Sequence, residues 1–147
     1  MSHNRPIQEP VRRLFAALTV VAAACRLTVL ERHSRFDLYV ERLRRGRPLP
    51  RHLRDPVLLG RAVRRLAHRL PPMGMGRCLK RSLLLLHLWS RCGLDPVLHI
   101  GVHSDGDRRR AHAWLTCDRP ELAAYCGHPA GTTETVSFAA GGRPASP

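Results

Sequence analysis

Cys78 and His112 are the residues of this sequence whose types and surroundings best fit covalent chemistry. Cys78 begins the most apolar helical pattern of the chain, and the basic residues Arg77 and Lys80 flank it. A helix N-terminus carries partial positive charge and unpaired N–H groups, which stabilise a thiolate and can bind an oxyanion. An imidazole close to a thiol can accept its proton, so the two residues together predict a nucleophile and its base.

Each of these residues also has a purely structural explanation. A cysteine packs well as a small apolar side chain in a protein interior. A histidine can be half-buried in a sheet, and His99 and His103 share a strand parity, so a histidine by itself is not diagnostic. Local chemistry leaves both explanations open for Cys78 and for His112.

The elements that must position the pair begin with helices. A helical apolar pattern runs from Val11 to about Val40, and the proline-containing residues 46–56 mark a connector. Asp55 is a suitable N-cap with Pro56 in the first helical position, which predicts a helix over Val57–Leu70.

The second half of the chain changes from helices to strands. The Pro- and Gly-rich residues 71–76 lead into a predicted helix over Cys78–Arg91, which Gly93 ends. Strands are then predicted over Val97–Val102, Ala111–Cys117, Glu121–Cys126 and Thr132–Phe138, with a polar loop over Ser104–Arg109 and a turn at Asp118–Pro120. This order predicts an α+β fold in which N-terminal helices pack on a small antiparallel sheet.

Length and composition bound the possibilities. The chain has 147 residues and a net charge of +14, and nearly all its basic residues are arginines. That length fits one domain, divided here into an N-terminal helical region (1–56), a core (57–138) and a disordered tail (139–147). The charge suggests an anionic partner or a generally arginine-rich composition. Nucleic-acid binding is the weaker alternative, because aromatics are 5% and no recognition motif is present.

The five cysteines favour a reduced, cytoplasmic protein, since their number is odd and no secretory signal pattern opens the chain. Cys117 and Cys126, which could face each other across a hairpin, make only a weak zinc pattern with His128. No cofactor is expected. Leu14–Leu30 is almost entirely apolar, which predicts a core helix or a membrane-surface helix rather than a span.

Three sequence blocks, taken in order, are similar to a known family. Cys78–Leu83, Leu98–Val102 and Ala111–Leu115 resemble the Cys-Leu-x-x-Ser-Leu, Ile-Gly-Val and Ala-His-Ala-Trp-Val blocks of the lasso-peptide processing B proteins. The likeness is greatest to the peptidase half of the split form, a short, basic, stand-alone chain, and runs over about residues 57–118.

The resemblance implies a transglutaminase-like, papain-type fold and a role in making ribosomal lasso peptides. It implies that Cys78 is the nucleophile and His112 the base of a cysteine peptidase that removes the precursor's leader. The partners implied are the lasso precursor peptide, a small leader-binding protein that delivers it, and an asparagine-synthetase-like cyclase. No specific nucleic acid is implied.

One part of the family pattern is missing from this chain. The family places an acidic residue about twelve residues past the histidine, where this sequence has Ala124. Asp118 and Glu121 are the nearest acids, and both lie too close to the predicted turn to reach His112. If that hairpin forms, the residue opposite His112 is near Tyr125. The alternative function is therefore a catalytically impaired protein that binds peptide or scaffolds the same biosynthetic complex.

Overall fold

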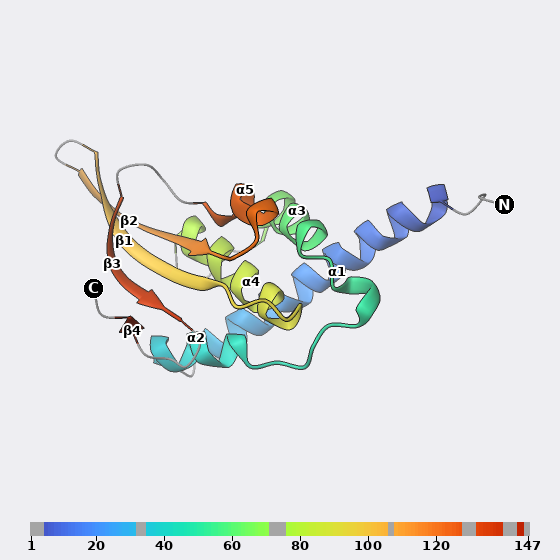
Figure 1. The fold of residues 1–147 in the computed structure, drawn as a ribbon, viewed down its shortest axis with the longest axis horizontal. Helices are drawn as coiled ribbons and strands as arrows, with labels where there is room; N and C mark the ends of the chain where they lie inside the picture. The colour runs from blue at the N-terminus through green and yellow to red at the C-terminus, as the bar shows by residue number, and fades with distance from the viewer. Residues whose placement is uncertain are drawn as a thin grey trace.

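The computed structural model describes residues 5–31, 35–70, 76–105, 108–127, 132–139 and 144–145. Helices occupy the first part of the chain and a sheet the second (Figure 1). The elements are α1 (Arg5–Glu31), α2 (Phe36–Arg44), η1 (Arg51–Leu53), α3 (Pro56–Leu66), α4 (Arg77–Arg91), β1 (Val97–Asp105), β2 (Arg108–Thr116), η2 (Pro120–Leu122), α5 (Ala123–Cys126), β3 (Thr132–Phe138) and β4 (Pro144–Ala145). This arrangement confirms the predicted α+β fold.

Helix α4 is the centre of the fold. It contacts α1, α2 and α3 as well as β1 and β2. Eight consecutive residues, Ser82–Trp89, are buried, so the helix is covered on all sides. Two of its interior side chains bond to neighbouring elements: Trp89 Nε1 donates to the Pro56 carbonyl over 3.0 Å, and His87 Nδ1 lies 2.7 Å from the Leu43 carbonyl. A helix buried in this way holds Cys78 on a rigid support.

Helix α3 begins as the sequence predicts. Asp55 accepts a hydrogen bond from the Leu58 N–H over 2.9 Å, and Pro56 occupies the first helical position. Helical residues end at Leu66, and a turn continues to Leu70. The cap therefore fixes where α3 starts, and α3 forms one wall of the site described below.

The helical pattern predicted from Val11 to about Val40 forms two helices, α1 and α2. Arg35 is in an extended conformation before α2. The Tyr39 hydroxyl donates to the Leu27 carbonyl over 3.2 Å, which requires α2 to fold back on α1. An apolar periodicity read across both helices does not reveal such a reversal.

The sheet is antiparallel, with strand order β2-β1-β3-β4. Leu98 pairs with Leu115, and Ile100 pairs with Ala113, on the face that contributes to the core. The polar loop predicted over Ser104–Arg109 is largely strand, because β1 runs to Asp105 and β2 starts at Arg108.

The strand predicted over Glu121–Cys126 is wrong, because these residues form η2 and α5. Leu122 and Cys126 are both buried, and the Cys126 thiol donates to the Leu122 carbonyl over 3.4 Å. Their spacing of four places both side chains on one face of a helical turn. The hairpin expected to bring Cys117 and Cys126 face to face is therefore absent from this described part of the chain.

The C-terminal residues add a short edge to the sheet. Pro144 and Ala145 of β4 pair with Phe138 and Ser137 of β3. These two residues of the tail predicted to be disordered are in a strand, and the rest of that tail lies outside the described residues, apart from Ala139. Residues on both sides of position 56 contribute to one buried core.

Candidate active site

Cys78 lies in the first turn of α4, where the helix has no side-chain cap. Gly76 is the N-cap residue, and no acidic residue occupies the first turn. The half-buried Cys78 side chain turns back toward this end, since a Cβ at position 76 would lie 3.8 Å from its Sγ. The first N–H groups of α4 therefore have no side-chain cap from the described N-cap residue, and they lie beside the thiol.

His112 lies on β2, the outer strand of the sheet. Its neighbour across the ladder is Gly101, which places no side chain beside it. The imidazole stacks near Trp114, with ring centroids 6.3 Å apart and planes 18° apart, and Trp114 stacks on His99 at 5.4 Å. This row of rings limits how far the His112 ring can rotate.

The Gly127 carbonyl accepts a hydrogen bond from His112. The distance from His112 Nε2 to the Gly127 oxygen is 3.0 Å. A carbonyl can only accept, so Nε2 carries the hydrogen and donates. In the neutral ring, Nδ1 is then the nitrogen with a lone pair, which is the one able to take a proton from a thiol. A backbone carbonyl thus sets the tautomer that a base requires.

Gly127 is a glycine because its φ is +78°, a region that side-chain-bearing residues rarely adopt. A Cβ at this position would also meet the end of the Arg81 side chain, which would have to move aside. A helix that ends in a left-handed glycine after Cys126 is a recognisable sequence signal. A strand assignment for Glu121–Cys126 hides this signal.

Cys78 and His112 line the same cavity, which encloses about 300 Å³. The cavity lies between α3, the first turns of α4, and β2. Its lining residues are Arg64, Ala67, His68, Arg77, Cys78, Arg81 and His112. The two residues singled out by their chemistry are therefore brought together, although 33 positions separate them in the sequence.

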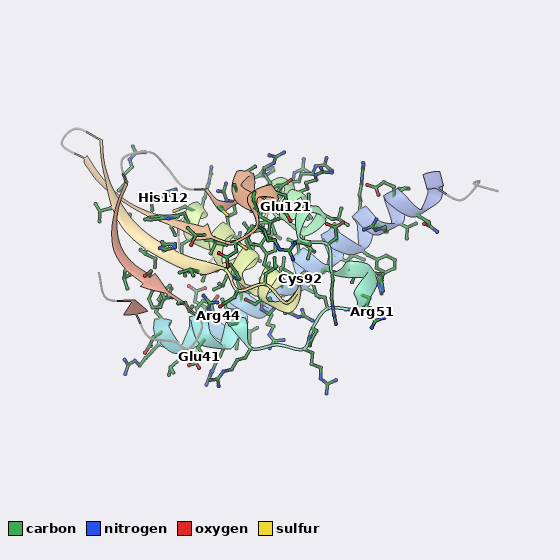
Figure 2. The ribbon with its side chains drawn as sticks, viewed as in Figure 1. Glu41, Arg44, Arg51, Cys92, His112 and Glu121 are labelled. Atoms are coloured by element: carbon green, nitrogen blue, oxygen red, sulfur yellow. The ribbon has the colours of Figure 1, made fainter. Side chains whose placement is uncertain are left out.

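The acidic residues considered in the sequence analysis do not approach His112. Figure 2 shows Glu121 and His112 at separate points of the structure, and Glu121 lies 3.5 Å from Arg119 Nη1. Asp118 and Ala124 are exposed and do not line the cavity. Tyr125 is not opposite His112, because the expected hairpin gives way to α5.

Glu134 is a further acid placed by strand register. Its Cα pairs with that of Gly101, which also pairs with His112 on the other side. Glu134 therefore belongs to the same cross-strand row as His112, two strands away. No local sequence pattern indicates this position for Glu134, because it depends on β3 pairing with β1 rather than with β2, the strand before it in the chain.

A sequence model of the transglutaminase-like superfamily matches residues 17–128 of the chain. The chain belongs to the transglutaminase-like superfamily. Catalytic domains of that superfamily are generally of cysteine type, and it includes cysteine peptidases. No curated protein and no solved structure matches the chain.

Within this transglutaminase-like domain, two polar contacts fix α4 relative to its neighbours. The buried Ser82 hydroxyl donates to the Ala113 carbonyl over 3.1 Å, next to His112 on β2. Lys80 Nζ donates to the Leu70 carbonyl over 2.7 Å, and burial lowers the pKa of Lys80. Ser82 thus holds the helix that carries the thiol against the strand that carries the imidazole.

The other cysteines of the transglutaminase-like domain have surroundings unlike that of Cys78. Burial raises the pKa of Cys92 to about 11, and burial together with Cys117 raises the pKa of Cys126. Cys92 lies at the opposite end of α4 from Cys78, and Cys25 is exposed on α1. Thiols with raised pKa values react slowly with electrophiles near neutral pH.

Among the residues that the structure describes, no group of three or more His, Cys, Asp or Glu side chains is placed to hold a metal ion. His128 of the weak zinc pattern lies outside them.

Proposed function

We propose that this chain is a cysteine peptidase that removes the leader from a ribosomally made lasso-peptide precursor. Superfamily membership supports the cysteine-type chemistry. The three sequence blocks around Cys78, Gly101 and His112 support the narrower substrate. The proposal includes a leader-binding protein that delivers the precursor, a cyclase that acts on the product, and a cytoplasmic location.

The observation that carries the proposal is the shared cavity of Cys78 and His112. The thiol lies at an uncapped helix N-terminus, and the imidazole is held by Gly127 with Nδ1 as its proton acceptor. A nucleophile, a base and a group that orients the base are the parts that papain-type catalysis requires.

The chemistry proceeds in two steps. Cys78 gives its proton to His112, and the thiolate attacks the scissile carbonyl carbon to form a tetrahedral oxyanion beside the first N–H groups of α4. The C–N bond breaks as His112 returns the proton to the leaving amine, which leaves a thioester on Cys78. Water then gives a proton to His112 and attacks the thioester, and the released thiol takes that proton back.

The experiment is co-expression of the chain with its precursor and leader-binding protein, followed by mass analysis of the peptide. The wild type is expected to yield the leader-free core, whereas Cys78→Ala and His112→Ala yield the intact precursor. Cys25→Ala is the matched control, because Cys25 is an exposed cysteine on α1. Normal trimming by Cys78→Ala would contradict the proposal.

A catalytically impaired peptide-binding or scaffolding protein is the second candidate. The missing acid at Ala124 favours it, because an orienting carboxylate normally contributes greatly to a triad. This candidate predicts that the wild type and Cys78→Ala bind the precursor equally well and that neither trims it.

A further inference from the structure

Cationic side chains line the cavity beside Cys78 and His112. Arg64 extends from α3, and Arg77 and Arg81 come from the first two turns of α4. No carboxylate occurs among the described residues that line the cavity. A peptide bond that reaches the thiol therefore enters a cavity whose described lining carries three arginines and no carboxylate.

Within the described part of the chain, no carboxylate pairs with these arginines. The ion pairs of the described residues lie elsewhere and involve none of the three. The Arg64 guanidinium lies 5.7 Å from the centre of the Tyr125 ring, and that of Arg81 lies against Gly127. An aromatic face and a peptide group position two of the charges without cancelling them.

We infer that the peptidase prefers substrates that carry Asp or Glu within a few residues of the scissile bond. This inference rests on the proposed function and adds to it the charge of the substrate. An exposed ion pair is worth about a twofold to fivefold change in affinity, so three arginines give roughly a 10- to 100-fold preference. Basic substrates are disfavoured by the same charges.

The test uses synthetic peptides that span one cleavage junction in three forms. The flanking residues are Asp and Glu in the first, the isosteric Asn and Gln in the second, and Lys in the third. Binding is measured with the full-length Cys78→Ala protein, and cleavage with the wild type. The acidic peptide is expected to bind at least tenfold more tightly than its amide form at about 50 mM salt, with most of the difference lost at about 500 mM.

Charge-reversal variants assign the effect to the cavity. Arg64→Glu and Arg77→Glu are each expected to reduce the acidic preference about tenfold or more, since reversal adds repulsion to a lost attraction. Arg51→Glu is the matched control, because Arg51 is an exposed arginine on η1 that does not line the cavity.

The outcomes separate this inference from the proposed function. Cleavage of all three peptides at equal rates overturns the charge preference and leaves the peptidase intact. Preferential binding of the acidic peptide without cleavage of any form overturns the peptidase and leaves the charge preference. An equal loss of preference in Arg51→Glu also overturns the inference, because it assigns the effect to total charge.

A second inference concerns α1, which is apolar on two opposite faces. One face packs into the core through residues such as Ala16, Val20 and Leu27. The other presents large exposed apolar side chains, with Leu14 59% and Leu18 55% exposed. These exposed residues are Val11, Leu14, Phe15, Leu18, Val21 and Val29, the α1 stripe. On a helical projection they cover an arc of about 120°.

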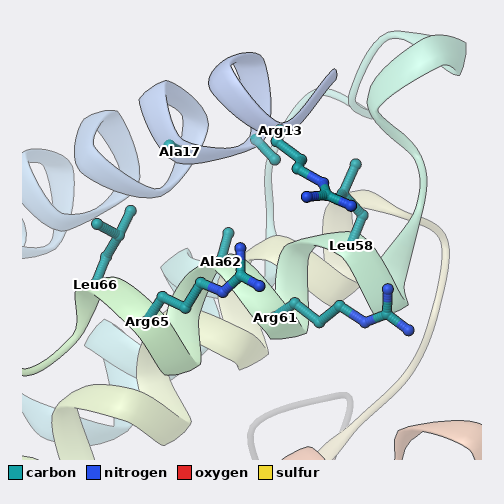
Figure 3. A pocket seen from close by; sticks show the side chains of 8 residues that line it. Arg13, Ala17, Leu58, Arg61, Ala62, Arg65 and Leu66 are labelled. Carbon is teal, nitrogen blue, oxygen red and sulfur yellow. The ribbon is translucent and has the colours of Figure 1, made fainter. Parts of the chain in front are cut away.

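Arginines lie near the α1 stripe on both α1 and α3. By helical periodicity Arg26 lies at one edge of the stripe. A groove between α1 and α3, which no stripe residue lines, carries Arg13, Arg61 and Arg65, and Figure 3 shows them along its length. Arg13 is paired with Glu9, whereas Arg61 and Arg65 take part in none of the described ion pairs.

We infer that the α1 stripe binds the surface of an anionic membrane. An apolar stripe with cations on its flanks is the arrangement by which a helix lies in the headgroup region of a bilayer. The net charge of +14 adds long-range attraction to such a surface. Gln8–Glu31 is also long and apolar enough for a span, with a mean hydropathy of 1.8, but its core-facing side is already packed. Figure 1 shows the first turns of α1 extending beyond the other helices, where a flat surface can reach them.

The test is sedimentation of the full chain with phosphatidylcholine vesicles, with or without about 30% phosphatidylglycerol. Binding is expected only to the anionic vesicles. Leu14→Gln combined with Leu18→Gln should lower partitioning at least tenfold, and Arg61→Glu with Arg65→Glu should lower it several-fold. Leu38→Gln, at a residue 46% exposed on α2, is the matched control and should bind as the wild type does.

Two results would overturn the membrane inference. One is the absence of any difference between anionic and neutral vesicles. The other is a wild-type protein that does not bind vesicles but forms a dimer in solution, together with a Leu14→Gln, Leu18→Gln protein that stays monomeric. In that case a second copy of the chain would cover the α1 stripe.

Discussion

Replacing Gly127 by alanine separates the positioning of His112 from the stability of the fold. At φ +78°, alanine pays about 1–2 kcal/mol of backbone strain in the free energy of unfolding. Its Cβ would meet the flexible end of the Arg81 side chain, which can move aside. Relief of the backbone strain by a change in φ at residue 127 would turn the peptide away from His112 Nε2, whose hydrogen bond to it is 3.0 Å long.

The cost to catalysis follows from the charge that His112 acquires. During the reaction the ring becomes an imidazolium, and a hydrogen bond to a charged group contributes about 1.5–3 kcal/mol. Loss of the bond should lower kcat roughly 10- to 150-fold, because each 1.4 kcal/mol is about a tenfold change in rate. The assay is leader removal under saturating precursor, together with urea unfolding of the same samples.

Gly93→Ala is the matched control for Gly127→Ala. Gly93 has φ +86° at the end of α4, with nothing within 4 Å of an added Cβ, so it carries the same backbone strain without a contact to the site. Gly93→Ala should lose about 1–2 kcal/mol of stability and keep its kcat. A Gly127→Ala protein that keeps kcat within about threefold of Gly93→Ala would refute the orienting role of the carbonyl.

Three further predictions concern buried polar groups. The pKa of His87 is lowered chiefly by burial, so at low pH the unfolded chain binds a proton that the folded chain does not. The free energy of unfolding should therefore fall by up to about 1.4 kcal/mol per pH unit as the pH drops below about 6.5. His87→Asn, which can still donate to the Leu43 carbonyl, should flatten this dependence in urea titrations at several pH values. Ser82→Ala should cost about 1–3 kcal/mol in the same assay, because it leaves the buried Ala113 carbonyl unpaired. Arg44→Ala should cost about 1–3 kcal/mol, because the 9% exposed Arg44 side chain donates to two backbone carbonyls that would lose this partner, whereas Asp95 is 66% exposed and stays hydrated. A loss under about 0.5 kcal/mol would contradict this.

Local signals predicted much of the fold. The Asp55–Pro56 pair fixed the start of α3, and Gly93 fixed the end of α4, because a cap acts through neighbouring residues alone. The alternation around Leu98 and the apolar run after Cys78 likewise located β1 and α4. The α+β class followed from the order of these elements.

The rest depended on contacts between distant residues. The reversal between α1 and α2 rests on Tyr39 and Leu27, and the strand order β2-β1-β3 rests on pairing across the sheet. Residues 121–126 form η2 and α5, in which Leu122 and Cys126, four residues apart, are both buried.

Half of the candidate site could be predicted from the sequence. Cys78 and His112 were identified by their chemistry and flanking blocks. Gly127 could not be identified in this way, because its role depends on its backbone carbonyl. Every residue has such a carbonyl, and only the fold brings this one to His112. The family pattern predicts an acidic residue at position 124, where this chain has Ala124. In the structure, the group that accepts a hydrogen bond from His112 is the backbone carbonyl of Gly127.

The most direct test of the Cys78–His112 pair is the rate at which iodoacetamide alkylates Cys78 as a function of pH. The site of modification is identified by peptide mass analysis, so that exposed Cys25 does not obscure it. The account predicts that Cys78 reacts faster at about pH 6 than a free thiol does, and that His112→Ala abolishes this advantage. A Cys78 that reacts no faster than a free thiol, with or without His112, would contradict the account.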